Sequence, residues 1–192
     1  MRYSASVSAL LLMGWLLGAA AQQSGSQRAG ARRANELTLA AVRPGRDSVK
    51  KVRSIYGKPD GGKTGDAQFS WEVSCRHEAL YVSTDASGTI EEIRAELHQN
   101  MTTTDCDAQL RSPWRTGKNL ALGDANSNVV RLYGEPDSRS PSTKDGQRLE
   151  LLYYAFDWAG SDVPQVMEVL CTVEHDGKPG RVIEITLAAS SL

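Results

Sequence analysis

The stretch YGKPD at residues 56–60 recurs 77 residues later as YGEPD at residues 133–137. Each copy follows an amphipathic stretch and precedes sequence with the apolar alternation of β-strands. A motif that repeats at a fixed offset is typical of chains built from repeated structural units. The sequence therefore predicts two tandem copies of one unit.

Both copies have the composition of a helix end. Gly57 and Gly134 suit the left-handed position that follows a helix, and Pro59 and Pro136 prevent the helix from continuing. We therefore expect one helix to end at residue 56 and another at residue 133. The apolar residues before each copy recur at helical spacing: Val49, Val52, Ile55 and Tyr56 before the first, and Val129, Val130, Leu132 and Tyr133 before the second.

Alternating apolar and polar residues after each copy predict antiparallel strands. In the first unit we expect strands at 69–75, from about 80, and at 90–97; in the second, after a loop at 138–147, at 149–158, 166–174 and 181–188. The predicted fold class is α+β. It consists of two tandem repeats, each a short helix or helix pair packed on a three- to four-stranded antiparallel sheet.

The N-terminus has the features of a secretory signal peptide. Arg2 precedes an apolar run at residues 9–17, and small residues at 19–21 provide a cleavage site. A membrane anchor is the alternative, but the run is shorter than the roughly 20 residues that cross a bilayer as a helix. We therefore expect a periplasmic or secreted protein with no stable membrane anchor after cleavage.

The rest of the chain divides by composition. Residues 22–35 are polar and lack apolar periodicity, which is typical of a disordered leader. The net charge of −1 gives no indication of a nucleic-acid partner. The predicted organisation is a signal peptide at 1–21, a disordered leader at 22–36, repeat 1 at 37–99, a linker at 100–118 and repeat 2 at 119–192.

The strand expected at 149–158 is apolar on both faces. Two explanations remain open: the two repeats pack their sheets on each other, or one face offers an aromatic surface to a partner. Aromatic side chains are favoured anchors at protein interfaces. The candidate partner-binding residues are Tyr154, Phe156 and Trp158, with Trp114 from the linker.

The chain has three cysteines, and exported proteins meet an oxidising compartment. We expect Cys75 and Cys106 to form a disulfide, and Cys171 to be a buried apolar side chain. A reactive Cys171 is the alternative. Because His175 lies four strand residues away, roughly 13 Å, it is too distant to act as a base. No spacing of ligands indicates a metal site, and no cofactor is predicted.

Residues 57–64, GKPDGGKT, match the letters of a phosphate-binding loop. That mechanism requires a buried strand before the loop and a helix after it, whose N-terminal amides hold the phosphates. Here a helix enters and a strand leaves, and Pro59 lacks an amide hydrogen. We interpret the match as coincidental, so phosphate-loop and thiol chemistry are only remote enzymatic alternatives.

The order of a helix ending in Tyr-Gly-x-Pro-Asp and a three-stranded meander resembles the SmpA/OmlA (BamE-like) envelope domain. It also resembles the β-lactamase-inhibitor-protein architecture, a tandem of two helix-plus-sheet units. The first resemblance implies an envelope protein that acts by binding, and the second implies an inhibitor.

The sequence therefore predicts an exported, non-enzymatic protein-binding module of the cell envelope, whose partner is another protein. The alternative is a proteinaceous inhibitor of a secreted or periplasmic hydrolase such as a β-lactamase.

Overall fold

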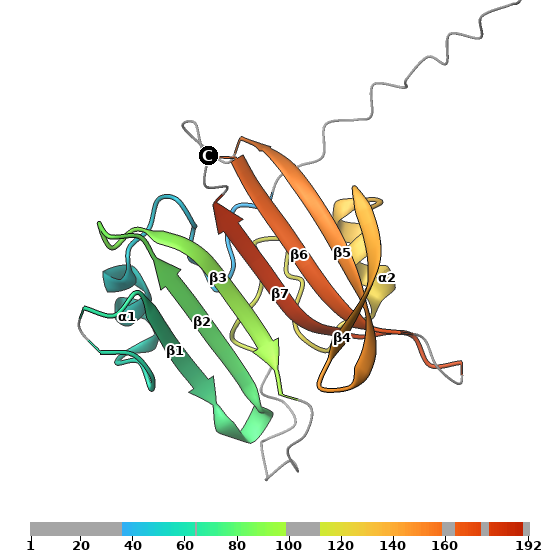
Figure 1. Ribbon diagram of the computed structural model, residues 1–192, viewed down its shortest axis with the longest axis horizontal. Helices are drawn as coiled ribbons and strands as arrows, with labels where there is room; N and C mark the ends of the chain where they lie inside the picture. The colour runs from blue at the N-terminus through green and yellow to red at the C-terminus, as the bar shows by residue number, and fades with distance from the viewer. Residues whose placement is uncertain (1–35, 64, 99–111, 159–163, 174–176, 190–192) are drawn as a thin grey trace, which may run out of the picture. The chain divides into compact units, whose positions relative to one another are not determined.

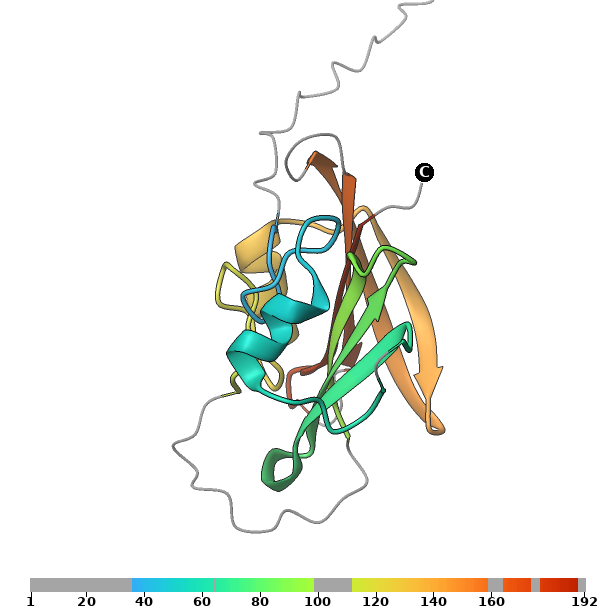
Figure 2. The same cartoon turned by 90° about the vertical axis from the view of Figure 1, so that its left-hand side faces the viewer.

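A computed structural model describes residues 36–63, 65–98, 112–158, 164–173 and 177–189, all within one compact unit. These residues form a single antiparallel sheet of seven strands, with two short helices on one of its faces (Figures 1 and 2). The elements are α1 (Val49–Tyr56), β1 (Gln68–Val73), a 3-10 turn η1 (Ser74–Arg76), β2 (Glu78–Thr84), β3 (Ile90–Leu97), α2 (Asn126–Tyr133), β4 (Ser138–Lys144), β5 (Gln147–Trp158), β6 (Pro164–Thr172) and β7 (Val182–Ala189).

The strands have the spatial order β1-β2-β3-β7-β6-β5-β4. The centre of the sheet is the antiparallel pair of β3 and β7, which runs from Glu92 opposite Ala188 to Glu96 opposite Glu184 (Figure 1). The prediction of two tandem repeats, each a helix on its own sheet, is therefore wrong. Two separate sheets would leave β3 and β7 as edges with unpaired backbone groups, and their pairing removes both edges.

The loop expected at 138–147 is also wrong, because most of it is the edge strand β4. Its sequence, SRSPSTK, has no apolar alternation, and most of its side chains are exposed. Pro141 has no amide hydrogen to donate, which is tolerated on an edge strand. Asp145 and Gly146, both with positive φ, make the turn into β5.

The two helices end where the sequence predicts. Gly57 and Gly134 follow α1 and α2 with φ of 82° and 78°, values that glycine adopts without steric cost. The two glycine carbonyls have equivalent partners: Gly57 O accepts from Trp71 Nε1 at 3.2 Å, and Gly134 O accepts from the Tyr154 hydroxyl at 3.0 Å. Each repeated stretch thus fixes a helix end to an aromatic side chain of the sheet.

The aspartate of each stretch binds the following part of the sheet. Asp60 Oδ2 accepts from the Glu72 amide at 2.8 Å, and Asp137 Oδ2 accepts from the Ala155 amide at 2.7 Å. The two copies therefore perform the same task at the two ends of one sheet. The motif recurs because each copy connects the end of a helix to the sheet, and this does not require two independent sheets.

Strand β5 is apolar on both faces because it contributes to two hydrophobic clusters. Leu152 and Tyr154 point to the main core beneath the helices. Leu149 packs with Leu170 and Ile183 in a second cluster. Two sheets packed face to face, one of the two predicted explanations, do not occur in the described residues.

The β4–β5 hairpin bends over the sheet on the side opposite the helices (Figure 2). Its last β4 residue, Lys144, reaches the central strands: its Nζ lies 2.7 Å from Glu96 Oε1 and 2.6 Å from Glu184 Oε2. Like charges directly opposite each other destabilise a sheet. Lys144 therefore neutralises the facing carboxylates of β3 and β7.

Two effects act on the Lys144 ammonium. Partial burial disfavours its charge, but the hydrogen bonds and charges of Glu184 and Glu96 outweigh burial, so the pKa of Lys144 lies above its ordinary value of 10.5. The charged form is thus the one that the fold stabilises.

A buried carboxylate fixes the start of the described chain. Glu36 is 2% exposed, and its oxygens accept from the amides of Leu37, Thr38, Gly117 and Lys118 and from the Tyr133 hydroxyl, at 2.6–3.0 Å. Burial, and then the charge and hydrogen bond of Glu36, raise the pKa of Tyr133 far above its ordinary value. The hydroxyl therefore remains a donor to the carboxylate.

Parts of the predicted domain organisation lie outside the described residues: the signal peptide, the leader to residue 35, and residues 100–111 of the linker. The end of that predicted linker, residues 112–118, is packed into the fold, since Ser112, Trp114 and Thr116 are buried. This segment is part of the globular unit.

Tyr133→Phe removes a donor to Glu36, and hydrogen bonds to charged groups contribute about 1.5–3 kcal/mol. We expect it to lower the free energy of unfolding by about 2 kcal/mol, measured by urea denaturation. Tyr56→Phe is the matched control, because the Tyr56 hydroxyl donates to the neutral Ala40 carbonyl at 3.1 Å; we expect a loss of about 1 kcal/mol. Equal losses would contradict a special contribution from the carboxylate.

Lys144→Met removes the cation that Glu96 and Glu184 share and leaves Arg94, 3.8 Å from Glu96, as the remaining arginine or lysine near the pair. We expect it to lower the free energy of unfolding at pH 7 by about 1–3 kcal/mol. Adding Glu184→Gln should restore much of this loss, whereas Lys178→Met, at an exposed site, should have little effect.

The same comparison has a defined pH dependence. Because the pKa of Lys144 is raised in the folded state, its stabilisation is full below the unfolded pKa and is lost as pH rises through the folded value. The difference between wild type and Lys144→Met should shrink above about pH 10.5. Equal stability of the two proteins at pH 7 would contradict the proposed neutralisation.

Candidate functional site

The face of the sheet opposite the helices presents one residue from every strand in a continuous line. The strand registers place these residues directly opposite one another. We call this line the central row: Ser70, Tyr81, Arg94, Thr186, Glu168, Tyr153 and Ser138, in order from β1 to β4. Ser138 is exposed and the other six are half-buried, so the row faces solvent.

The β2–β3 part of the row is ordered by aromatic and charged contacts. The Arg94 guanidinium lies over the Tyr81 ring, 4.8 Å from its centroid, and Arg94 Nε is 3.8 Å from Glu96 Oε2. The Tyr81 hydroxyl lies 3.4 Å from His98 Nε2. Burial, and then the charge of Glu96, raise the pKa of Tyr81, so the phenol stays protonated. The cluster can donate hydrogen bonds but has no activated nucleophile.

Carboxylates flank the central row. Glu72 and Glu92 lie in the neighbouring rows, and Glu168 lies in the row itself. None of the three forms an ion pair within the described part of the chain. This differs from Glu96 and Glu184, which share Lys144. The open face therefore offers unpaired negative charge beside two tyrosines.

A hollow adjoins the row at the β1 edge. It has a volume of about 560 Å³ and is lined by Tyr81, Ser70, Phe69, Gln68, Ala67, Asp66, Gly61 and Gly62. The side chain of a bound partner could enter here beside the Tyr81 ring. A smaller cavity of about 60 Å³ lies where the hairpin tip meets Glu96 and His98.

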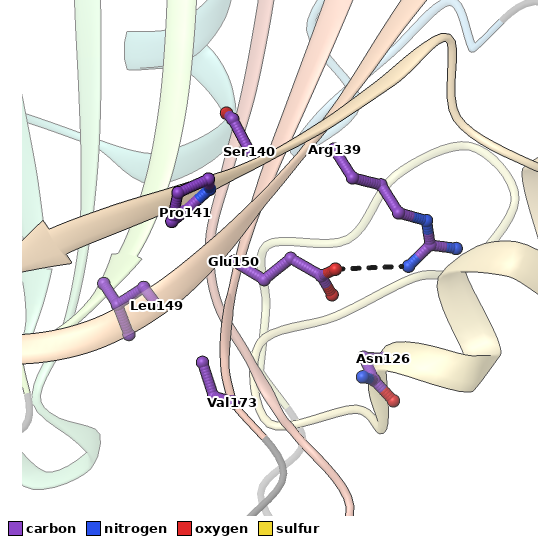
Figure 3. Close-up of a pocket in the computed structure, with 7 residues that line it drawn as sticks. All are labelled: Asn126, Arg139, Ser140, Pro141, Leu149, Glu150 and Val173. Atoms are coloured by element: carbon purple, nitrogen blue, oxygen red, sulfur yellow. Dashed lines mark hydrogen bonds and ion pairs between the residues drawn. The ribbon is translucent and has the colours of Figure 1, made fainter.

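A second groove lies at the other edge of the sheet, with a volume of about 450 Å³ (Figure 3). Its charged groups are paired with each other: Arg139 Nη1 is 3.5 Å from Glu150 Oε1, and Arg139 Nη2 is 2.9 Å from Glu135 Oε2. The remaining lining residues are Asn126, Ser140, Pro141, Leu149 and Val173. Because these charges already have partners, we do not assign this groove a ligand.

Three of the predicted partner-binding aromatics are core residues. Trp114 is 1%, Tyr154 0% and Phe156 6% exposed. The Tyr154 and Phe156 rings stack with centroids 6.1 Å apart, and Tyr133 packs against both. They are therefore not available as a contact surface in this structure. The side chain of Trp158 lies outside the described residues.

The predicted cysteine pair is only partly described. Cys75 is half-buried in η1, but Cys106 lies outside the described residues, so their disulfide stays a prediction. Cys171 is a free, fully buried thiol. Burial, and then the charge of Glu150, raise the pKa of Cys171 to about 12, with an opposing effect from Arg139.

Two further findings concern the described residues alone. They contain no group of three or more His, Cys, Asp and Glu side chains placed to hold a metal ion. None of their helices has the length and apolar character needed to cross a membrane.

Sequence reasoning missed the central row. Each of its members is an ordinary polar or aromatic residue within its own strand, and no motif connects them. The alternation pattern does identify which side chains point away from the core. It does not predict which strands are neighbours, and only the β3–β7 pairing brings Arg94 next to Thr186.

No protein-family model matches the sequence, and no curated protein matches it. Two of the solved structures that are similar to this chain are described here. One is a DUF4309 family protein (YjgB) from Bacillus subtilis, at 14% identity and a TM-score of 0.46, covering 81% of this chain and 88% of that one. The other is a cysteine-rich secretory protein (SAV1118) from Staphylococcus aureus, at 12% identity and a TM-score of 0.42, covering 82% of this chain.

The present chain spans 48% of the length of the staphylococcal protein. At these identities and TM-scores, neither similarity supports an inference about function. Neither protein is a SmpA/OmlA domain or a β-lactamase inhibitor, and that resemblance stays a prediction.

Proposed function

We propose that this chain is an exported, non-enzymatic protein-binding module of the cell envelope, and that the open face of its sheet contacts the partner. The observation that carries the proposal is the central row, in which all seven strands place a side chain on one solvent-facing line. Tyrosine and arginine, which recur among the most energetic interface residues, occupy it at Tyr81, Arg94 and Tyr153. The expectation of export rests on residues 1–21 of the sequence.

The dimensions of the row support this proposal. Neighbouring strands lie about 4.8 Å apart, so seven strands extend over roughly 29 Å. A standard protein interface covers about 800 Å² on each partner. The central row and the flanking row through Glu92 would form the middle of such a contact. The flanking row through Glu96 and Glu184 is largely covered, since Ala79, Glu96 and Leu170 in it are buried.

The charges of the face indicate the chemistry of the partner. Glu72, Glu92 and Glu168 have no cationic partner among the described residues, so a surface that presents Lys or Arg opposite them would gain complementary charge. The partner is therefore a protein with a basic contact surface. A secreted hydrolase that loses activity in the complex would make this function inhibition.

The proposal is tested by affinity capture on the purified chain, immobilised through its C-terminus, from the envelope and secreted fractions of the source cells. Glu168→Lys and Glu92→Lys reverse a charge on the open face. Glu91→Lys makes the same charge change at an exposed neighbouring position that lies outside these rows, at the irregularity where β3 has no partner residue for it on β2. We expect a partner retained by wild type and Glu91→Lys, and bound at least about tenfold more weakly by the face variants.

Titration with the isolated partner then measures the affinity for each variant. If all four proteins bind the same partner equally, the open face is not the contact surface. If Glu91→Lys loses the partner to the same extent as the two face variants, the proposal is also contradicted, because binding would then depend on net charge alone.

Thiol chemistry is the enzymatic alternative, and Cys171 provides its test. Because the thiol is buried and its pKa is raised to about 12, we expect no alkylation of Cys171 by iodoacetamide in the native protein at pH 8. Intact mass should show one alkylation after unfolding and three after reduction, given the predicted Cys75–Cys106 disulfide. Rapid alkylation of Cys171 in the native state would contradict its assignment as an inert core residue.

A further inference from the structure

The loop between α1 and β1 encloses a hollow distinct from the open face. Its volume is about 930 Å³. Three of the residues that line it carry positive charge: Arg53 from α1, and Lys58 and Lys63 from the loop. The remaining lining residues are Gly57, Pro59, Asp60 and Gly62. The hollow coincides with the stretch whose letters match a phosphate-binding loop.

The structure excludes the phosphate-loop mechanism at this place. The loop leaves the C-terminal end of α1 and enters a strand, so no helix N-terminus faces it. Packing explains why residue 62 is a glycine, because a Cβ at this position would overlap the Gln68 carbonyl oxygen. The glycines and the proline of the stretch are thus explained by the local fold. Its lysines are not.

The three cations have no anionic partner among the described residues. The hollow contains one carboxylate, Asp60, and its Oδ2 already accepts from the Glu72 amide. The end of α1 adds only a partial negative charge. A second carboxylate, Asp66, lies beside the loop, where its Oδ2 accepts from the Lys63 amide at 2.6 Å. The three full positive charges still exceed these two carboxylates, and an anion in the hollow would relieve the mutual repulsion of the cations.

Arg53 gives a second, independent indication. Its guanidinium lies against the Phe69 ring, 5.3 Å from the centroid, which holds the group in place. Its Nε is buried and has no hydrogen-bond partner within the described ranges. Buried donors are normally satisfied, and an unsatisfied one calls for an explanation. Because Nε is closed off from the hollow as well, an acceptor bound there would meet the other part of the guanidinium, which lines the hollow.

We propose that this hollow binds a phosphate group. A guanidinium offers several donors in one plane, which matches the oxygens of a phosphate, and two lysines add point charges that suit a multiply charged anion. The phosphate can be a free ion, part of a soluble phosphate chain, or the headgroup of an anionic phospholipid. The site shares no charged residue with the central row, so the proposal is independent of the proposed protein partner.

Isothermal titration of the full purified chain at low ionic strength tests the site. The ligands are inorganic phosphate, tripolyphosphate, and vesicles of phosphatidylglycerol in phosphatidylcholine, with pure phosphatidylcholine vesicles as the blank. Citrate tests the choice of phosphate over carboxylate. We expect saturable binding of at least one phosphate ligand, weakened by salt. Which ligand binds identifies the source of the phosphate.

The matched variants remove equal charge. R53Q/K58Q/K63Q changes the hollow, and K50Q/R148Q/K178Q changes exposed residues outside it. We expect the first to lose at least about tenfold in affinity and the second to stay within about twofold. K58Q/K63Q leaves the Arg53–Phe69 contact intact, so it reports on the site even if the triple variant fails to fold. Its expected loss is about fivefold.

Three outcomes would overturn the proposal. The first is the absence of saturable binding by every phosphate ligand. The second is an equal loss of affinity in the two triple variants, which would reflect net charge. The third is citrate binding as tightly as tripolyphosphate.

Discussion

The pairing of β3 with β7 brings Glu96 and Glu184 face to face at the centre of the sheet, and the rest of the structure depends on how this repulsion is removed. Lys144 removes it from the tip of the β4–β5 hairpin. The hairpin must bend over the sheet to reach the two carboxylates. In bending, it covers the second cluster of Leu149, Leu170 and Ile183. The contact of Lys144 with the two glutamates thus stabilises the pairing of β3 with β7 and also holds the β4–β5 hairpin in its bent position.

Local features of the fold could be predicted from the sequence, because they depend on neighbouring residues. The ends of α1 and α2 follow from Gly57 and Gly134, and six of the strands follow from apolar alternation. The sheet itself could not be predicted in this way. Strand β4 has no apolar pattern, and the two-sided apolar character of β5 suits a sandwiched strand as well as one covered by its own hairpin. The repeated motif favoured two separate units, although its role is local.

The candidate site shows the same limit. Buried aromatics and interface aromatics have identical strand patterns, so Tyr154 and Phe156 could not be told apart from a binding surface without the helices that cover them. The central row is assembled from one residue on each of seven strands, and its order exists only after the strand order is known. Two of the cations of the hollow, Lys58 and Lys63, lie within one short stretch of sequence, residues 57–64. The sequence also predicts that a helix enters this loop and a strand leaves it, as the structure has it. It does not predict that Arg53 of α1 lines the same hollow as the two lysines.

The carboxylate of Glu36 also has a consequence for how the chain can be shortened. It accepts from amides 81 and 82 residues further along the chain, at Gly117 and Lys118, and so connects the segment before α1 to the segment before α2. Trimming or protease cleavage before this position removes none of these hydrogen bonds. Cleavage directly after it would leave the amides of Thr38, Gly117 and Lys118 and the Tyr133 hydroxyl without their acceptor. Glu36 therefore marks the N-terminal boundary of the shortest fragment that keeps these contacts.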